Sequence, residues 1–524
     1  MKLRLQLILV LAASACAFAA APAKKPKLVL AVVVDQFRYD YLTRFRDDYK
    51  AGFARALEHG AVFTDAHHIH FPTVTAVGHS TFLSGATPSI SGIVGNEWYD
   101  RESGKSITSV SDPSVKLLGG APGRMGSSPH RLLVSTLGDE MKMDGKAGKT
   151  IGISINDRSA ILPVGHTADG AYWFDGATGN WVSSTYYFPE LPGWVKDVNQ
   201  SRPADKYLGA EWRSIRAEEG AGPSFTTLSK TPDASFYNSL EATPYGNELI
   251  ESMAERAIAA EQLGHHAGID LLSVSFSSND YVGHALGPDS PEVHDISIRT
   301  DRILGKLFDY LDAQIGADNY IFVMTADHGV SPTPEANHAR KMPGGRMAGS
   351  SLFGGLQTAL AEKYGEGKWV VGSSGPVPYL NTDLIREKKI DEIELGRFAA
   401  DKLRAIPHVF RVYTREQLLT GQVLEDYVSR AVRNGFYRQR SGDLFVIPEA
   451  YWFFDEHTDS KGTSHGTPFN YDTHVPIIFM GPGIKAGRYH QTVAVNDIAP
   501  TLSALLDVEE PSGSVGRALT EIIE

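Results

Sequence analysis

Two short segments of this chain each set an aspartate and a histidine just after an apolar run. Asp280 and His284 follow the run LLSVSF, and Asp327 and His328 follow the run IFVM. Carboxylate oxygens and imidazole nitrogens are ligands that zinc accepts. A spacing of four residues lets Asp280 and His284 reach one ion if the turn between them is helical. The types and spacing of these residues therefore predict metal binding.

Two more candidate ligands have a similar setting. Asp35 directly follows the run LVLAVVV, and His465 lies shortly before the run VPIIFM, which completes a set of three carboxylates and three imidazoles. A lone histidine is more often a hydrogen-bonded polar residue, but six such groups at the ends of apolar runs predict two zinc sites with three protein ligands each. The other histidines considered are assigned to a loop (His67, His68 and His70) or to the support of a ligand (His474).

The apolar runs must bring these groups together. Short runs rich in β-branched residues are typical of buried strands in a parallel sheet. In open α/β sheets, catalytic groups gather beyond the carboxyl ends of such strands. A helix predicted over residues 293–315 joins the two Asp/His strands, which indicates a β-α-β crossover between parallel neighbours. The sequence thus predicts an α/β fold with a central, mostly parallel sheet flanked by helices.

A threonine supplies the candidate nucleophile. Thr75 lies in the segment FPTVTAVGHSTFLSG, which reads as a loop leading into a helix that Gly85 terminates. A hydroxyl is a poor nucleophile at neutral pH unless a metal ion helps to ionise it. The backbone N–H groups of a helix N-terminus also favour a bound anion. By itself Thr75 would be read as a helix N-cap, and only the candidate metal ligands elsewhere make it a nucleophile.

Changes in composition divide the rest of the chain. A length of 524 residues exceeds the usual single domain, so we expect one large α/β unit with insertions or two domains. A stretch rich in Gly, Ser, Trp and Tyr, from about residue 97 to about 247, is interpreted as an inserted cap. Residues from about 331 to about 445 form a second, mixed insertion. The predicted catalytic domain spans residues 28–524.

The N-terminus has the pattern of an export signal. A basic start and a short apolar core precede the small-residue motif at Ala17–Ala19, which predicts a signal peptide over residues 1–19 and a leader over residues 20–27. The apolar core is too short for a confident membrane span. We expect a periplasmic or secreted protein; lipid attachment at Cys16, the sole cysteine, is the minor alternative.

The overall composition is typical of a globular protein and argues against one class of function. An apolar content of 42% and a charged content of 21% are ordinary for a soluble globular chain. The formal net charge of −12 argues against a dedicated nucleic-acid binder, which would present a basic surface. It does not exclude anionic substrates, because metal ions can dominate the local field of a site. We expect a monomer that does not bind nucleic acid.

Six segments in a fixed order resemble the alkaline phosphatase superfamily, and most closely its phosphate-irrepressible, PafA-type branch with a threonine nucleophile. They read VVVDQFRYD, FPTVTAVGHSTFLSG, GIVGNEWYD, DYVGHALGP, TADHGV and GTSHGTPFNYDTHVPIIFMGPG. The resemblance implies hydrolysis of small phosphate monoesters through a phosphothreonine. It also implies a role for each matched residue: one zinc held by Asp280, His284 and His465; a second held by Asp35, Asp327 and His328, with Thr75 as a further ligand between the two; and Asn96 as a phosphate-binding residue.

One position departs from this pattern. Where PafA-type enzymes carry a Lys-x-Arg pair, this chain reads Asn156-Asp157-Arg158. Arg158 can fork onto two phosphate oxygens, but Asn156 offers only a neutral donor. A dianionic monoester needs the missing charge more than a diester does, so a phosphodiesterase or a broad mono- and diesterase is the alternative function. A sulfatase would need a Cys or Ser precursor at the nucleophile, and a binding protein without metal would be expected to show a broken ligand set.

Overall fold

The computed structural model describes residues 25–215, 223–456 and 461–524. The predicted signal peptide, most of the predicted leader and Cys16 lie outside the described residues. Among the described residues, no helix is both long enough and apolar enough to cross a membrane.

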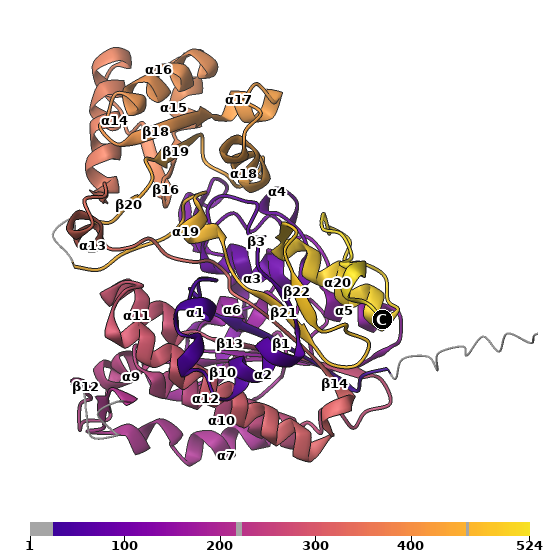
Figure 1. Ribbon diagram of the computed structural model, residues 1–524. Coiled ribbons are helices and arrows are strands. Elements are labelled where there is room, and N and C mark those ends of the chain that lie inside the picture. Colours follow the sequence, from indigo (N-terminus) through magenta and orange to yellow (C-terminus); the bar gives the residue numbers. More distant parts are fainter. Residues whose placement is uncertain (1–24, 216–222, 457–460) are drawn as a thin grey trace, which may run out of the picture.

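One large mixed sheet runs through the centre of the molecule (Figure 1). It has eleven strands, in the spatial order β22 (Gly487–Tyr489), β2 (Ala61–Phe63), β21 (Ile477–Met480), β14 (Tyr320–Thr325), β1 (Leu28–Val34), β13 (Ile269–Phe276), β8 (Ala147–Ser154), β9 (Gly170–Asp175), β10 (Asn180–Ser184), β6 (Ser111–Leu118) and β7 (Met125–Ser127). The parallel pairs that link neighbours in the middle of the sheet are β14–β1, β1–β13, β13–β8 and β8–β9. The predicted α/β class is confirmed, and the parallel arrangement is concentrated at the centre.

The first described strand of the chain, β1, lies near the middle of the sheet. All seven residues of β1 are buried, as its unbroken apolar run predicts, and β1 pairs in parallel with both β13 and β14. The expectation that β13 and β14 are direct neighbours is wrong, because β1 lies between them. A strand buried on both faces needs a hydrogen-bonded partner on each edge, and these two strands provide them. The carboxyl ends of all three strands therefore meet at one edge of the sheet.

The strand that follows His465 runs in the opposite direction. β21 is antiparallel to both β14 and β2, whereas a parallel strand was expected from its apolar run. Its amino end therefore lies at the sheet edge where the parallel strands have their carboxyl ends. This reversal explains how a residue that precedes its strand can join residues that follow theirs.

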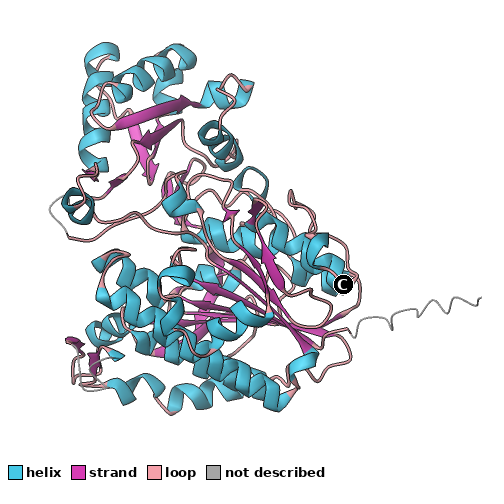
Figure 2. Cartoon of the chain, viewed as in Figure 1, coloured by secondary structure: helices cyan, strands magenta, loops and turns pink. Residues whose placement is uncertain are grey.

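Helices cover both faces of the sheet (Figure 2). One layer is formed by α2 (Gly52–His59), α10 (Pro244–Ala260) and α12 (Pro291–Gln314), in which α12 packs against both of the others. A second layer is formed by α3 (Thr75–Ser84), α5 (Leu137–Met143), α6 (Asp157–Ile161) and α20 (Ile498–Leu506). The core between these layers is continuous from β1 through β13 and β14 to the helices on either side.

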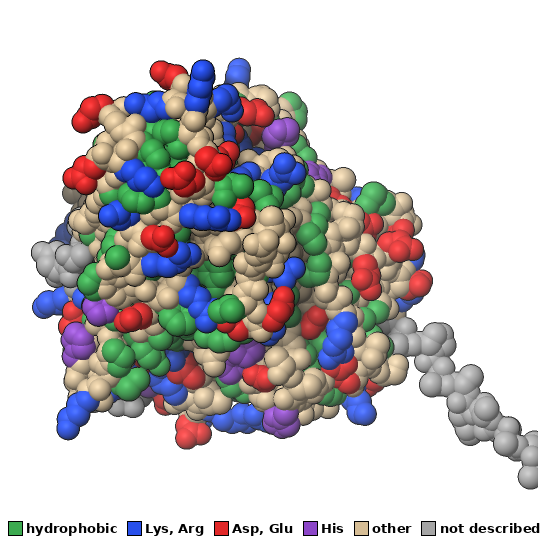
Figure 3. All heavy atoms as spheres, turned by 90° about the horizontal axis from the view of Figure 1, so that it is seen from above, with side chains coloured by type: hydrophobic (Ala, Val, Ile, Leu, Met, Phe, Trp, Pro, Cys, Tyr) green, Lys and Arg blue, Asp and Glu red, His purple; other side chains and the backbone are tan. Residues whose placement is uncertain are grey.

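The two segments interpreted as insertions have different structures. The first contributes β8, β9, β10, β6 and β7 to the main sheet and so extends it. The second builds a lobe above the sheet edge, from α14 (Gly349–Tyr364), α15 (Thr382–Glu387), α16 (Glu392–Arg404), α17 (Arg415–Thr420), α18 (Tyr427–Gly435) and the hairpins β16–β17 (Val370–Ser374 and Val377–Leu380) and β18–β19 (Val409–Thr414 and Leu444–Pro448) (Figure 1). The lobe has an apolar cluster of its own, and a second cluster joins it to Phe71, in the segment before α3. Acidic and basic side chains are interspersed on the face seen from above (Figure 3).

Candidate metal centre and active site

The first group of candidate ligands forms where α11 (Ser278–Leu286) meets the segment before β21. One helical turn places Oδ1 of Asp280 3.3 Å from Nε2 of His284. Nε2 of His465 lies 3.1 Å from Nε2 of His284 and 3.8 Å from Oδ1 of Asp280. Two imidazole nitrogens and a carboxylate oxygen at these separations suit a single tetrahedral cation.

The second group lies at the ends of β1 and β14. Nε2 of His328 is 3.3 Å from Oδ2 of Asp327 and 3.7 Å from Oδ1 of Asp35. All three residues are almost completely buried, with at most 1% of their surface exposed. The imidazole rings of His328 and His465 stack with centroids 3.5 Å apart, so the two groups are adjacent and belong to one centre.

The histidines of both groups are oriented in the same way. Each ring places Nδ1 against a backbone carbonyl oxygen, which fixes the tautomer and leaves the lone pair of Nε2 free. The three pairs are His284 with Thr463 O at 2.8 Å, His328 with Gly329 O at 2.9 Å and His465 with Thr73 O at 2.8 Å. Most metal-binding histidines have this arrangement.

The buried group carries polar atoms without partners. Both carboxylate oxygens of Asp35, Oδ2 of Asp327 and Nε2 of His328 are buried and have no hydrogen bond to the described residues. Burial raises the pKa of Asp35 well above its usual range, and Asp327 adds to the shift. Burial also raises the pKa of Asp327 to about 7. Unpaired buried carboxylates are costly, and a bound cation would satisfy them. The residues therefore fit a cation, and the mixture of imidazole and carboxylate donors suits zinc.

Thr75 is the first residue of α3, directly after the N-cap residue Val74. It is 2% exposed, and its hydroxyl has no hydrogen bond to the described residues. The close approach of α3 to Asp327 depends on Gly78, because a Cβ atom there would lie 2.1 Å from the backbone oxygen of Asp327. As predicted, Gly85 ends the helix, with a φ of 65°. The start of α3, with Thr75, therefore packs against the segment that carries Asp327.

Asn96 is anchored at the start of the same helix. Its Oδ1 accepts a 2.7 Å hydrogen bond from the backbone N–H of Ala76, the residue after Thr75. The amide NH₂ group of Asn96 is then available to donate to an anion beside Thr75.

Arg158 and Asn156 belong to a different helix, α6. Asn156 is the N-cap residue of α6, and Arg158 lies in the first turn of that helix. Nε of Arg158 is buried without a partner among the described residues, and the guanidinium is close enough to help lower the pKa of His465, although burial is the main cause of that shift. Asn156 lines a polar cavity of about 410 Å³ together with Glu241 and Tyr281.

Two residues of the centre were not identified from the sequence. Gln36 donates from Nε2 to Oδ1 of Asp280 at 2.6 Å and from its backbone N–H to Oδ1 of Asp327 at 3.1 Å, so it contacts both groups. Nδ1 of His79 lies 3.4 Å from Oδ2 of Asp327, and its Nε2 lies 2.8 Å from Oγ of Ser275. Gln36 directly follows Asp35, but an amide after a strand is not in itself a signal for a metal centre.

A cavity of about 340 Å³ opens beside His284, His465 and Asn96. Its far wall comes from the hairpin turn at Ser374–Pro376 and from β20 (Trp452–Phe454). Much of this wall is apolar. The cavity gives a ligand at the centre room to extend toward the lobe.

Comparison with known proteins identifies the family. The family described as type I phosphodiesterase / nucleotide pyrophosphatase matches residues 29–470. Alkaline phosphatase PhoV of Synechococcus elongatus is 36% identical to this chain over 95% of it and 93% of that protein, and alkaline phosphatase PafA of Elizabethkingia meningoseptica is 36% identical over 95% of each. The chain belongs to the type I phosphodiesterase / nucleotide pyrophosphatase family, within the alkaline phosphatase superfamily.

Solved structures agree with this assignment. The crystal structure of wild-type alkaline phosphatase PafA matches with a TM-score of 0.89 and 34% identity, covering 96% of this chain and all of that one. Murine ectonucleotide pyrophosphatase / phosphodiesterase 5 shares the fold, with a TM-score of 0.56 at 15% identity. The predicted family, fold and enzyme class are thereby confirmed: the protein is a hydrolase of phosphoric esters.

Proposed function

We propose that this protein is an exported, monomeric two-zinc phosphatase that cleaves phosphate monoesters through a phosphothreonine on Thr75. One observation carries the proposal: six ligand atoms form two adjacent groups, some of them buried without partners, and the ligand His465 contacts Thr73 O, just before the helix that begins with Thr75. Asp280, His284 and His465 would hold one ion, and Asp35, Asp327 and His328 would hold the other with Thr75 as a further ligand. Relatives named alkaline phosphatase support the monoester class.

The bound ions would supply Lewis acidity, which ionises a hydroxyl at neutral pH and neutralises charge on a leaving oxygen. The protein contributes position and hydrogen-bond donors. Oγ1 of Thr75 attacks phosphorus, the bond from phosphorus to the ester oxygen breaks, and the alcohol leaves. Water then cleaves the phosphothreonine and releases inorganic phosphate. Because phosphoryl transfer requires little covalent chemistry from the protein, positioning and electrostatics supply most of the catalysis.

The chain offers two side-chain donors to the non-bridging oxygens. The amide NH₂ group of Asn96 would donate beside Thr75, because Oδ1 of Asn96 is held by the backbone N–H of Ala76, and the guanidinium of Arg158 would approach from the side of His465. Donors placed in advance stabilise charge that develops in the transition state without reorganising. The alcohol part of the substrate would occupy the cavity beside His284 and His465.

A second candidate function is a phosphodiesterase or a broad mono- and diesterase. The observation that favours it is Asn156, which has no charge and whose Oδ1 is already engaged by Tyr281. A diester carries one negative charge fewer than a monoester dianion, so it needs less cationic stabilisation from this side of the site.

The test measures rates on an aryl phosphate monoester and an aryl phosphate diester, with zinc content determined on the same sample. Thr75→Ala should abolish the phosphothreonine trapped at low pH and lower monoester kcat/KM by more than about 10³-fold, while Thr75→Ser should keep much of the activity. Thr43→Ala, on the surface, serves as the control. Near wild-type turnover by Thr75→Ala would exclude Thr75 as the nucleophile.

A further inference from the structure

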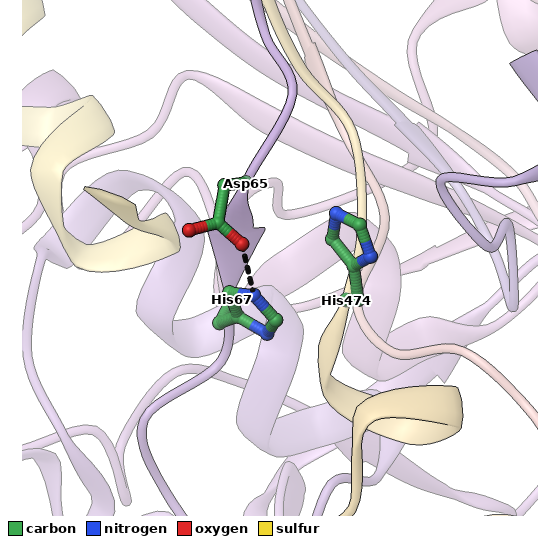
Figure 4. Close-up of side chains that lie close together, drawn as sticks. All are labelled: Asp65, His67 and His474. Atoms are coloured by element: carbon green, nitrogen blue, oxygen red, sulfur yellow. Dashed lines mark hydrogen bonds and ion pairs between the residues drawn. The ribbon is translucent and has the colours of Figure 1, made fainter. Parts of the chain in front are cut away.

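A third group of metal-ligating side chains lies outside the active centre. It consists of Asp65, His67 and His474, from each of which one ligand atom lies within 4.8 Å of the other two. Figure 4 shows Asp65 and His67 on one segment of the chain and His474 on a segment beside it. The proposed mechanism uses none of these residues.

The backbone holds the two segments in register. His67 ends the short strand β3 (Ala66–His67), and His474 directly follows α19 (Asn470–Thr473). The two histidines form an isolated antiparallel bridge. The backbone N–H of His68 donates to Thr473 O at 2.9 Å, and that of Val475 donates to Ala66 O at 3.0 Å. The three side chains are therefore presented by a fixed backbone rather than by a flexible surface loop.

Stacking and hydrogen bonds restrain the side chains. The ring of His474 stacks on His67 at a centroid distance of 4.7 Å and on Tyr39 at 4.6 Å. Nε2 of His67 lies 2.9 Å from Oδ1 of Asp65, and the second carboxylate oxygen of Asp65 accepts a hydrogen bond from the hydroxyl of Thr492. Restrained ligands lose less conformational entropy when they bind an ion.

Each histidine also has one ring nitrogen against a protein oxygen. Nδ1 of His67 contacts Oγ1 of Thr473 at 3.2 Å, and Nε2 of His474 contacts the backbone oxygen of Thr64 at 3.0 Å. Contacts of this kind orient the histidines of metal sites. Among the described residues, His474 contacts none of the six active-site candidates. Its expected role in supporting one of those ligands is therefore wrong.

We infer that Asp65, His67 and His474 form a third cation site, which ties the segment leading to Thr75 to the segment that follows His465. Two imidazoles and one carboxylate favour zinc or a similar transition metal over magnesium or calcium, which prefer oxygen ligands. The side chain of Asp65 is 42% exposed and that of His67 is 19% exposed, so solvent can reach the ion and complete its coordination.

The position of the site gives the cation a structural role. After His67 the chain continues to His68, whose Nε2 lies 3.0 Å from Ala326 O, next to the candidate ligand Asp327. On the other segment, the backbone oxygen of Asp472 accepts a 2.7 Å hydrogen bond from the N–H of Gly329. An ion that joins the two segments would brace the loop at Asp327–Gly329 from both sides without touching the substrate.

The experiment uses the full chain, stripped of metal and then reconstituted with Zn²⁺. Wild type should bind one more equivalent of zinc per chain than His67→Ala or His474→Ala, as counted by elemental analysis after equilibrium dialysis. His294→Ala is the matched control, because it removes another histidine paired with an aspartate (His294 Nε2 to Asp48 Oδ2, 2.8 Å). This pair belongs to none of the three-ligand groups found among the described residues. This control should bind as much zinc as wild type.

Two further measurements separate this site from the catalytic one. The reference is the Tm of wild type with only the active centre filled. Zinc at about a hundred times the dissociation constant of the third site should raise this Tm by about 2–3 °C. The same zinc concentration should not raise the Tm of His67→Ala. Monoester kcat/KM of the variants should stay within about twofold of wild type. Equal zinc content in wild type, His67→Ala and His474→Ala would overturn the inference. If His67→Ala does not fold, Asp65→Asn provides the same comparison.

Discussion

The hydroxyl oxygen of Tyr281 lies 3.1 Å from Oδ1 of Asn156. Because the amide oxygen can only accept a hydrogen bond, Tyr281 is the donor, and the NH₂ group of Asn156 is turned away from it. The carboxyl group of Glu241 lies beside the same hydroxyl. A chain of three polar side chains therefore sets the orientation of the residue that stands where PafA-type enzymes carry a lysine.

Removing the hydroxyl of Tyr281 tests this orientation. Tyr281→Phe should lower monoester kcat/KM by about two- to tenfold, because a neutral hydrogen bond is worth about 0.5–1.5 kcal/mol and Asn156 could then rotate. Tyr489→Phe removes a remote hydroxyl that donates to Lys485 O and should change nothing. If Tyr281→Phe has the kinetics of wild type, Asn156 does not act on the substrate through this contact.

Placing a lysine at position 156 tests the preference between monoesters and diesters. Asn156→Lys should raise monoester kcat/KM by about ten- to a hundredfold and leave diester kcat/KM flat or lower, since a charged hydrogen bond is worth roughly 1.5–3 kcal/mol. Arg158→Ala should reduce the rate for monoesters more than the rate for diesters. Steady-state rates on paired aryl substrates provide the measurement. An equal change for both substrate classes in Asn156→Lys would show that this position does not face the phosphate.

Gln36 should control metal affinity without being a ligand. Gln36→Ala removes the side-chain donor to Asp280, and loss of such an outer contact costs about ten- to a hundredfold in metal affinity. The apparent zinc affinity, measured by competition with a chromophoric chelator, should fall by that factor. Gln491→Ala, which removes an exposed amide paired with Glu521, should leave the affinity unchanged. Full affinity in Gln36→Ala would limit Gln36 to a packing role.

Glu241 should make stability depend on pH. Burial raises its pKa from 4.5 to about 7 in the folded protein. Between those two pH values the folded state keeps a proton that the unfolded chain has released, so stability falls as pH rises from 4.5 through about 7. Glu241→Gln cannot ionise and should raise the Tm at pH 8 but not at pH 4.

The control for Glu241 is Glu58→Gln, an exposed position on α2. Its change in Tm, measured at both pH values, gives the effect of removing an exposed carboxyl group. A Tm difference between wild type and Glu241→Gln that does not change with pH would mean that Glu241 has the same pKa in the folded and unfolded states.

Much of the candidate centre could be predicted from local sequence. Apolar runs marked β1, β13 and β14, and Asp35, Asp280 and Asp327 follow these strands at short range. The spacing of Asp280 and His284 placed both on one side of a helical turn, which the structure confirms. These features are local, because strand burial and helical periodicity are determined by residues within one or two turns of one another.

Only the tertiary structure decided how distant segments meet. No local pattern indicates that β21 runs antiparallel to β14, yet that reversal brings the segment of His465 to the edge that carries His328. The bridging position of Gln36 and the pairing of His67 with His474 likewise depend on contacts between residues far apart in the chain. Strand order and direction follow from the packing of the whole sheet, and a side chain gains such partners only after that packing is complete.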